Sequence, residues 1–195
     1  MKIENIFIAN RKMTLPPYNR QIGGLLGPRL RPRRKVFISY HHRNDQGWYD
    51  RFSTLYSSNL ELFSDNSLDR VIDSDNSEYL NRTIREECIF GSSITIVLCG
   101  AETGKRRWVD WEIYSTLYCE HALLGLVLPT CSRSSDNKYI VPTRLHYNIE
   151  SGYARWILWT ENAQTLSNSI EDAIRRSSQK NLIRNSEERM KRSLS

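Results

Sequence analysis

The stretch Arg106-Arg107-Trp108-Val109-Asp110-Trp111-Glu112-Ile113 follows closely on an almost wholly apolar run, Ile94–Cys99, and indicates how the chain folds. The run has the composition of a buried strand. Apolar residues recur every four positions from Val109 to Leu117, which predicts a helix with one apolar stripe. Trp108 and Glu112 are also four apart, so they share a neighbouring face of that helix. Because the helix starts where the strand ends, these side chains lie at the edge where open α/β sheets bind ligands.

Strand and helix patterns alternate along the rest of the chain. The segments with strand composition are Lys35–Tyr40, Leu60–Phe63, Ile94–Cys99, Ala122–Leu128 and Tyr153–Trp159. Helical spacing of apolar residues follows four of them, in segments that include residues 48–56, 80–88, 109–117 and 166–174. This order predicts a flavodoxin-like, three-layer α/β sandwich around a central five-stranded parallel sheet. Residues 130–150 are polar and predicted to be irregular, and Asn44 or Asp45 is a candidate cap for the first helix.

Composition divides the chain of 195 residues into three parts. Residues 1–34 are basic and rich in Gly and Pro, which predicts an arm or linker. Residues 35–180 form the predicted domain, and 181–195 form a charged tail that we expect to be frayed. The net charge is +6, but residues 1–35 alone hold nine Lys and Arg and one acid, so the remainder carries −2. The domain therefore lacks the basic charge of a nucleic-acid binder.

The chain carries no sign of secretion or of a membrane span. Its longest apolar runs are far shorter than a bilayer requires, and the N-terminus lacks the continuous apolar core of a signal peptide. We therefore expect a cytoplasmic protein that makes no contact with a membrane. The four cysteines show no CxxC spacing, which favours buried, reduced thiols over a metal cluster or a disulfide framework.

Several common catalytic motifs are missing from the sequence. It contains no GxGxxG after a strand, no GxxxxGK[ST], no HExxH and no GxSxG. Adjacent His41 and His42 point to opposite sides of an extended chain, which disfavours joint ligation of one metal ion. We therefore predict no metal and no resident cofactor.

Polar side chains after three predicted elements meet at the carboxyl edge of the predicted sheet. They are Ser39, Tyr40 and His41 after the first strand, Asp65 after the second, and Arg107, Trp108 and Glu112 in the helix quoted above. In a functional interpretation, arginine holds phosphate, an aromatic ring stacks on a ring of the ligand, and the carboxylate acts on a sugar. In the simpler interpretation, Glu112 is a solvent-facing helix residue and the tryptophans only pack. Spacing alone leaves both open.

Four segments in series resemble the TIR-like ThsB family of the bacterial Thoeris anti-phage system. Val36-Phe37-Ile38-Ser39-Tyr40 is similar to the first strand of TIR domains. Leu98-Cys99-Gly100-Ala101-Glu102-Thr103 is similar to the family's Leu-x-Gly-x-x-Thr turn. Residues 106–113 then resemble its Arg-x-Trp-Val-x-x-Glu-Ile helix, and a strand containing Leu124-Gly125-Leu126 follows. The resemblance covers roughly residues 35–176.

The resemblance implies a TIR fold and an enzyme whose substrate is NAD. It aligns Glu112 with the family's catalytic glutamate, which cleaves the nicotinamide–ribose bond, and Trp108 with the accompanying aromatic residue. It implies that the ADP-ribose part becomes a cyclic or conjugated signal, and that this diffusible nucleotide activates an effector during phage infection. It also implies a homo-oligomer on activation. Two alternatives stay open: a non-catalytic TIR module that signals by homotypic assembly, and a flavodoxin-like nucleotide binder or nucleoside-processing enzyme.

Overall fold

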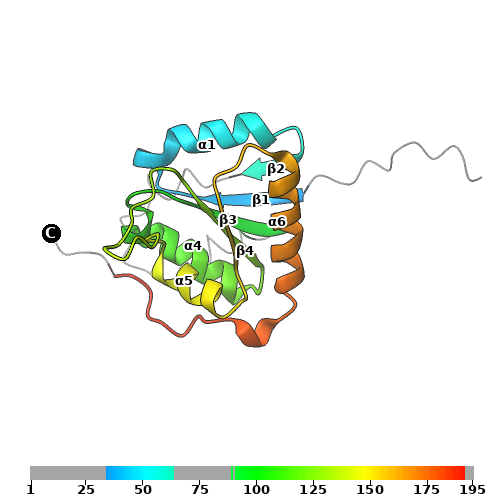
Figure 1. Ribbon diagram of the computed structural model, residues 1–195. Helices are drawn as coiled ribbons and strands as arrows, with labels where there is room; N and C mark the ends of the chain where they lie inside the picture. The colour runs from blue at the N-terminus through cyan, green and yellow to red at the C-terminus, as the bar shows by residue number, and fades with distance from the viewer. Residues whose placement is uncertain (1–33, 64–88, 90, 192–195) are drawn as a thin grey trace, which may run out of the picture. The chain divides into compact units, whose positions relative to one another are not determined.

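The computed structural model describes residues 34–63, 89 and 91–191 (Figure 1). Its strands are β1 (Arg34–Ser39), β2 (Leu60–Phe63), β3 (Ile94–Cys99), β4 (Ala122–Val127) and β5 (Arg155–Leu158). Its α-helices are α1 (His42–Tyr56), α4 (Arg107–Tyr118), α5 (Thr143–Glu150) and α6 (Ala163–Arg176), with short 3₁₀ turns at Thr103–Lys105 and Lys180–Leu182.

The five strands form one parallel sheet in the order β2-β1-β3-β4-β5. This is the flavodoxin-like order, and it confirms the predicted fold class. Strands β3 and β4 are buried at every position, as expected of central parallel strands that are covered on both faces.

Two apolar layers cover the sheet. One layer joins α1 and α6 to the even-numbered residues of β1, β3 and β4, and Phe52 and Ile170 are buried within it. The other joins α4 and α5 to odd-numbered residues such as Val97, and it contains Val109, Ile113 and Leu117 of the predicted stripe. Figure 1 shows α1 above the sheet and α4 and α5 below it. The three layers therefore leave α4 with one side packed on β3 and β4.

Two predictions about the second half of the chain are wrong. Residues 130–150 are not irregular throughout, because α5 occupies Thr143–Glu150. The tail is not frayed as far as Lys191, because its backbone hydrogen-bonds to side chains of both α4 and α5. The helix expected over 80–88 lies outside the described residues. Among the helices that the structure describes, none is long and apolar enough to cross a membrane.

Candidate active site

Glu112 lies in the middle of α4 and is only 3% exposed. Its carbonyl oxygen accepts a hydrogen bond of 2.8 Å from the hydroxyl of Thr116, one turn later. The Thr116 hydroxyl in turn meets that of Thr95 in β3, also at 2.8 Å, and both threonines are fully buried. This polar link fixes the turn of α4 that carries Glu112 against the sheet. The interpretation of Glu112 as a solvent-facing helix residue is therefore wrong.

Trp108 and Arg107 form an aromatic and cationic cluster at the start of α4. The Trp108 and Trp111 rings meet edge to face, with centroids 6.0 Å apart. The guanidinium carbon of Arg107 lies 4.4 Å from the centre of the Trp108 ring and 5.7 Å from that of Trp111. Such cation–π contacts hold the arginine over the indoles. Trp108 is partly exposed, so one turn of helix separates an accessible aromatic ring from the buried Glu112.

The end of β1 sends its two predicted site residues to opposite faces of the sheet. Ser39 pairs in register with Val97 and so points toward the α4 layer. It is 1% exposed, and its hydroxyl has no hydrogen-bond partner within the described part of the chain. Tyr40 belongs to the α1 layer, where its ring stacks on Tyr49 at 4.7 Å and its hydroxyl donates to Gln46 at 2.9 Å. The structure therefore brings Ser39, and not Tyr40, to the face on which α4 packs.

Of the two remaining predicted ligand contacts, His41 and Asp65, the structure describes only His41. His41 is 8% exposed and precedes α1, where its carbonyl oxygen accepts the N–H of Asp45 at 2.8 Å. Asp65 lies outside the described residues.

The turn between β3 and α4 is tied to α1 by a buried carboxylate. The hydroxyl of Thr103 accepts the N–H of Gly100 at 2.8 Å and lies 3.0 Å from Oδ2 of Asp45, to which it can donate. The Asp45 carboxylate lies so close to Gly100 that a Cβ there would be 2.1 Å from Oδ1. Burial raises the pKa of Asp45, and the hydrogen bond from Thr103 partly opposes that rise. In the Leu-x-Gly-x-x-Thr turn, the Gly therefore leaves room for this carboxylate and the Thr hydrogen-bonds to it.

The predicted cap of α1 is wrong, because Asp45 lies inside the helix and bonds to the β3–α4 turn instead. The helix begins at His42, and His41, at the cap position, makes no capping hydrogen bond with its side chain. Asn44 and Asp45 lie in the first turn and use their side chains across the fold. Asn44 donates to Glu102 at 3.0 Å, and Asp45 accepts from Thr103. Sequence spacing could not reveal this role, because 58 positions separate the partners.

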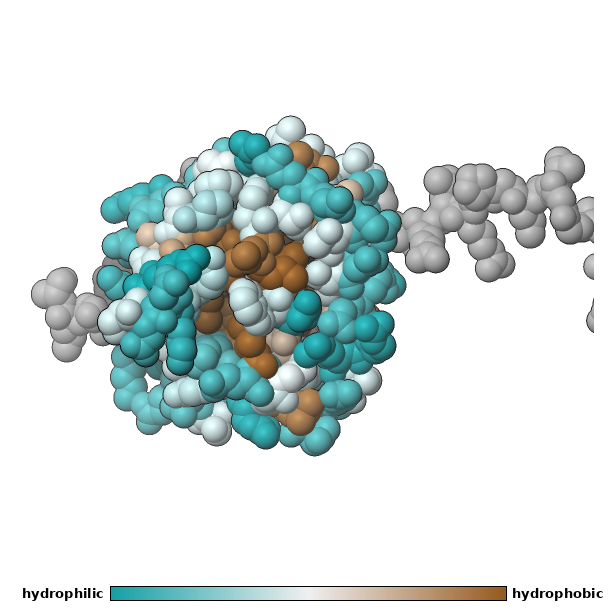
Figure 2. All heavy atoms as spheres, viewed as in Figure 1, coloured by the Kyte–Doolittle hydropathy of each residue, from teal (hydrophilic) through white to brown (hydrophobic). Residues whose placement is uncertain are grey.

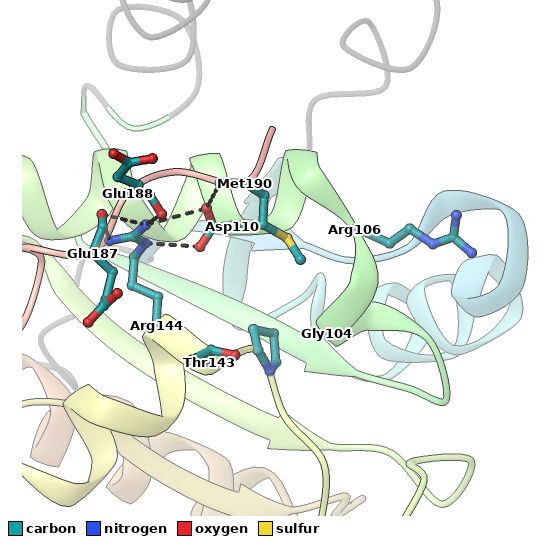
Figure 3. Close-up of a pocket in the computed structure, with 9 residues that line it drawn as sticks. Gly104, Arg106, Asp110, Thr143, Arg144, Glu187, Glu188 and Met190 are labelled. Carbon is teal, nitrogen blue, oxygen red and sulfur yellow. Dashed lines mark hydrogen bonds and ion pairs between the residues drawn. The ribbon is translucent and has the colours of Figure 1, made fainter. Parts of the chain in front are cut away.

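A second buried polar cluster joins α4 to α5. Arg144, only 2% exposed, pairs with Asp110 at 3.0 Å. Beside this pair lies a cavity of about 200 Å³, between the start of α4, the start of α5 and residues 187–190 (Figure 3). Asp110 and Arg144 were not among the predicted site residues, and their 34-residue separation gives no signal in the sequence.

Comparison with known families matches residues 37–133 to the TIR-like domain of the Thoeris protein ThsB. This segment belongs to the ThsB TIR-like family. It contains the second half of β1, the Gly100–Thr103 turn and the Trp108–Glu112 pair, in the arrangement just described. A ThsB-type TIR-like domain supports a role in TIR-domain defence.

The other comparisons concern single proteins. Comparison with curated proteins gives no match. Among solved structures, the chain is similar to one described as the activated Roq1 resistosome directly recognizing the pathogen effector XopQ (TIR domains). The identity is 12% and the TM-score is 0.36, over 74% of this chain and 84% of that one. The ThsB match ends before α5, so Arg144 and everything it contacts after residue 133 lie outside the matched segment.

Proposed function

We propose that this chain cleaves the nicotinamide–ribose bond of NAD, with Glu112 as the catalytic carboxylate. The observation that carries the proposal is the position of Glu112 within the ThsB-matched segment, buried in α4 and one turn after the partly exposed Trp108. In this proposal NAD is a substrate, and the chemistry uses no metal and no resident cofactor.

A single carboxylate suffices for this reaction. Nicotinamide leaves as a neutral ring from a cationic pyridinium, so no general acid has to protonate it. Ordinary glycosidases need a second carboxyl group because their leaving group is an alkoxide. An anion beside the ribose stabilises oxocarbenium-like charge, and it does so more strongly where water is excluded, as around a residue that is 3% exposed.

The neighbouring groups suit the rest of the substrate. The Trp108 ring offers a face for stacking, and Arg107 supplies positive charge beside it for a phosphate. The buried hydroxyl of Ser39 lies on the α4 face and has no hydrogen-bond partner among the described residues, so it can bond to a ribose hydroxyl. We propose that a nucleophile other than water then attacks the anomeric carbon as nicotinamide leaves: an internal group gives a cyclic product, and a group of a second small molecule gives a conjugated one. The cyclic or conjugated product would carry the signal to an effector in anti-phage defence.

The test compares the purified protein with Glu112→Gln and with Glu150→Gln. Glu150 is an exposed residue at the end of α5, so its substitution removes a carboxylate elsewhere. Each protein is incubated with NAD, with and without phage-infected lysate, and the products are separated by liquid chromatography with mass detection. We expect nicotinamide and an ADP-ribose derivative from the parent and from Glu150→Gln only. An intact NAD pool with all three folded proteins would refute the proposal.

A non-catalytic assembly module is the second candidate, and exposed apolar side chains favour it. Ile140, Trp156 and Leu158 are 48%, 40% and 52% exposed, and β5 is an edge strand of the described sheet. Figure 2 shows apolar side chains gathered near the centre of one face. Exposed aromatic and aliphatic groups of this kind serve as interface anchors. If the proposed enzyme also works as an assembly, its specific activity rises with protein concentration. Activity strictly proportional to concentration would show that one copy suffices.

A further inference from the structure

The chain end contains an extended segment, Arg184–Met190, which we call the C-terminal strap. On the α5 side it is bound mostly through its main chain, with one further bond of 2.9 Å from Arg144 to the side-chain oxygen of Asn185. Arg144 donates to the carbonyl oxygens of Glu187 and Glu188, in each case at 3.2 Å. Asn148 forms a pair of bonds with Arg184, donating to its carbonyl oxygen at 2.7 Å and accepting its N–H at 2.9 Å. Two side chains that are at most 2% exposed thus direct their polar groups at the strap.

On the α4 side the strap contacts the helix that carries Glu112. The N–H of Met190 donates to Oδ2 of Asp110 at 2.9 Å, and the indole N–H of Trp111 donates to the Met190 carbonyl at 3.0 Å. The guanidinium of Arg189 lies 4.9 Å from the centre of the Trp111 ring and 5.0 Å from that of Tyr114. Figure 3 shows Arg144 between Asp110 and the strap residues Glu187 and Glu188, so one arginine links both helices to the strap.

The strap is held by polar bonds and not by buried apolar side chains. The apolar anchors of this region, Leu182 and Ile183, come just before it and pack on the α4–α5 core. Within the strap, Glu187 and Glu188 are exposed, and Met190 is 39% exposed. When such a segment opens, water can replace its hydrogen bonds and no apolar core is broken, so it can open locally while the rest of the domain stays folded.

Release of the strap would loosen the turn of α4 that directly precedes Glu112. Asp110 and Trp111 immediately precede Glu112 in the helix, and both are bound to Met190. Glu112 is 3% exposed in this structure, so α4 has to move before the carboxylate can reach a substrate. The strap also closes one side of the cavity between α4 and α5.

We propose that residues 184–190 are an autoinhibitory strap, which holds α4 against α5 with Glu112 buried and whose release opens the site. The catalytic part of this proposal rests on the proposed NAD-cleaving function. The hold on α4 does not, and it can be measured separately. The strap and Arg144 lie after residue 133, outside the segment matched by the ThsB family, whereas their partners Asp110 and Trp111 on α4 lie within it.

The first experiment uses the full chain with Arg189→Ala and Met190→Pro combined. Proline has no N–H to donate to Asp110, and alanine removes the guanidinium from Trp111 and Tyr114. Ser186→Ala, at an exposed strap position, is the matched control. Hydrogen exchange is followed in α4 and, as a reference, in β3. We expect exchange in residues 107–113 to be about tenfold faster in the double variant, with β3 and the control unchanged.

The second measurement is NAD cleavage by the same proteins, which we expect to rise about tenfold in the double variant. Unchanged α4 exchange, or cleavage that falls while the protein stays folded, would overturn the strap proposal. If no protein cleaves NAD but α4 exchange rises, the proposed function fails and the hold of the strap on α4 stands.

Truncation provides an independent variant. A chain ending at Ile183 lacks the strap, and one ending at Lys191 retains it. We expect only the shorter chain to show fast α4 exchange, and a synthetic peptide of residues 184–190 to restore its protection. Loss of protection in β3 as well, in both the truncated and the double variant, would show that the strap is an integral part of the fold and would overturn its role as a releasable element.

Discussion

Gly100→Ala should be among the most damaging single-methyl additions to this protein. A Cβ at this position would lie 2.1 Å from Oδ1 of Asp45 and 2.5 Å from its Cγ and Oδ2. The carboxylate would have to retreat by roughly 1 Å to reach a tolerable contact. Asp45 is 1% exposed and has a short side chain, so it cannot swing into solvent without moving α1.

The expected cost follows from two contributions. Overpacking a buried site costs about 1–3 kcal/mol. If the 3.0 Å bond between Thr103 and Asp45 also breaks, a buried carboxylate loses a donor, at a further cost of about 1–3 kcal/mol. We therefore expect Gly100→Ala to lower the free energy of unfolding by about 2–6 kcal/mol.

The chain supplies a matched control. Gly47 lies within α1, and a Cβ there would have no heavy atom within 4 Å. Because alanine is the better helix former, Gly47→Ala should raise stability by up to about 1 kcal/mol. Urea denaturation followed by circular dichroism measures both variants against the parent.

A double-mutant cycle identifies the cause of the damage. Asp45→Ala removes the carboxylate that the new methyl group would strike. Gly100→Ala should therefore cost less by at least about 1 kcal/mol in the Asp45→Ala background than in the parent. An equal cost in both backgrounds, or a stable Gly100→Ala protein, would refute the reasoning.

Three further predictions concern the polar groups that position the elements. Burial raises the pKa of Asp45 in the folded protein above its value in the unfolded chain, so between these two pKa values the folded protein binds more protons. The parent should therefore lose stability relative to Asp45→Asn as pH rises across that interval, and urea denaturation between pH 4 and 7 checks the sign. Thr116→Val leaves the buried hydroxyl of Thr95 without its partner and should cost about 1–3 kcal/mol, and adding Thr95→Val should recover part of that loss in the same assay. Asn162→Ala removes the acceptor for the N–H of Thr165 at the start of α6 and should cost about 1 kcal/mol by thermal or urea unfolding, whereas an effect within 0.3 kcal/mol, roughly the noise of additivity, would contradict the cap.

The predicted sheet succeeded because its strands carry their own signal. In β3 and β4 almost every residue is apolar, and every side chain is buried, so composition alone marks them as central strands. Alternation of side chains also explains why two adjacent candidates separated. Ser39 and Tyr40 are neighbours in the chain, and in a strand neighbours face opposite layers. Ser39 and Tyr40 therefore could not both lie on the face of the sheet where α4 carries Glu112.

Helix α5 escaped prediction because it is short and its inner face mixes apolar with polar residues. Of its three buried residues, Leu145 is apolar, but Arg144 and Asn148 are not. Val141, Leu145 and Ile149 do recur four apart and pack on the α4–α5 core, but only two of them lie within this eight-residue helix, so its periodic signal is short. The two polar residues are tolerated inside because Asp110 and the strap satisfy them. These partners are at least 34 positions away in sequence, so the ordered chain end could not be predicted from local pattern.

The position of Glu112 depends on contacts at three levels of sequence separation. Helical periodicity sets Val109 and Ile113 on the sheet, which turns Glu112 toward the interior. The Gly100–Thr103 turn, seated on Asp45, fixes where α4 begins. The strap then holds the first turns of α4 through Asp110. The first two restraints lie within the segment shared with the ThsB family, and the third does not. The carboxylate is thus placed by elements within the matched segment, and the helix that carries it is restrained by the strap outside that segment. The strap can therefore change in sequence without altering how Glu112 is placed.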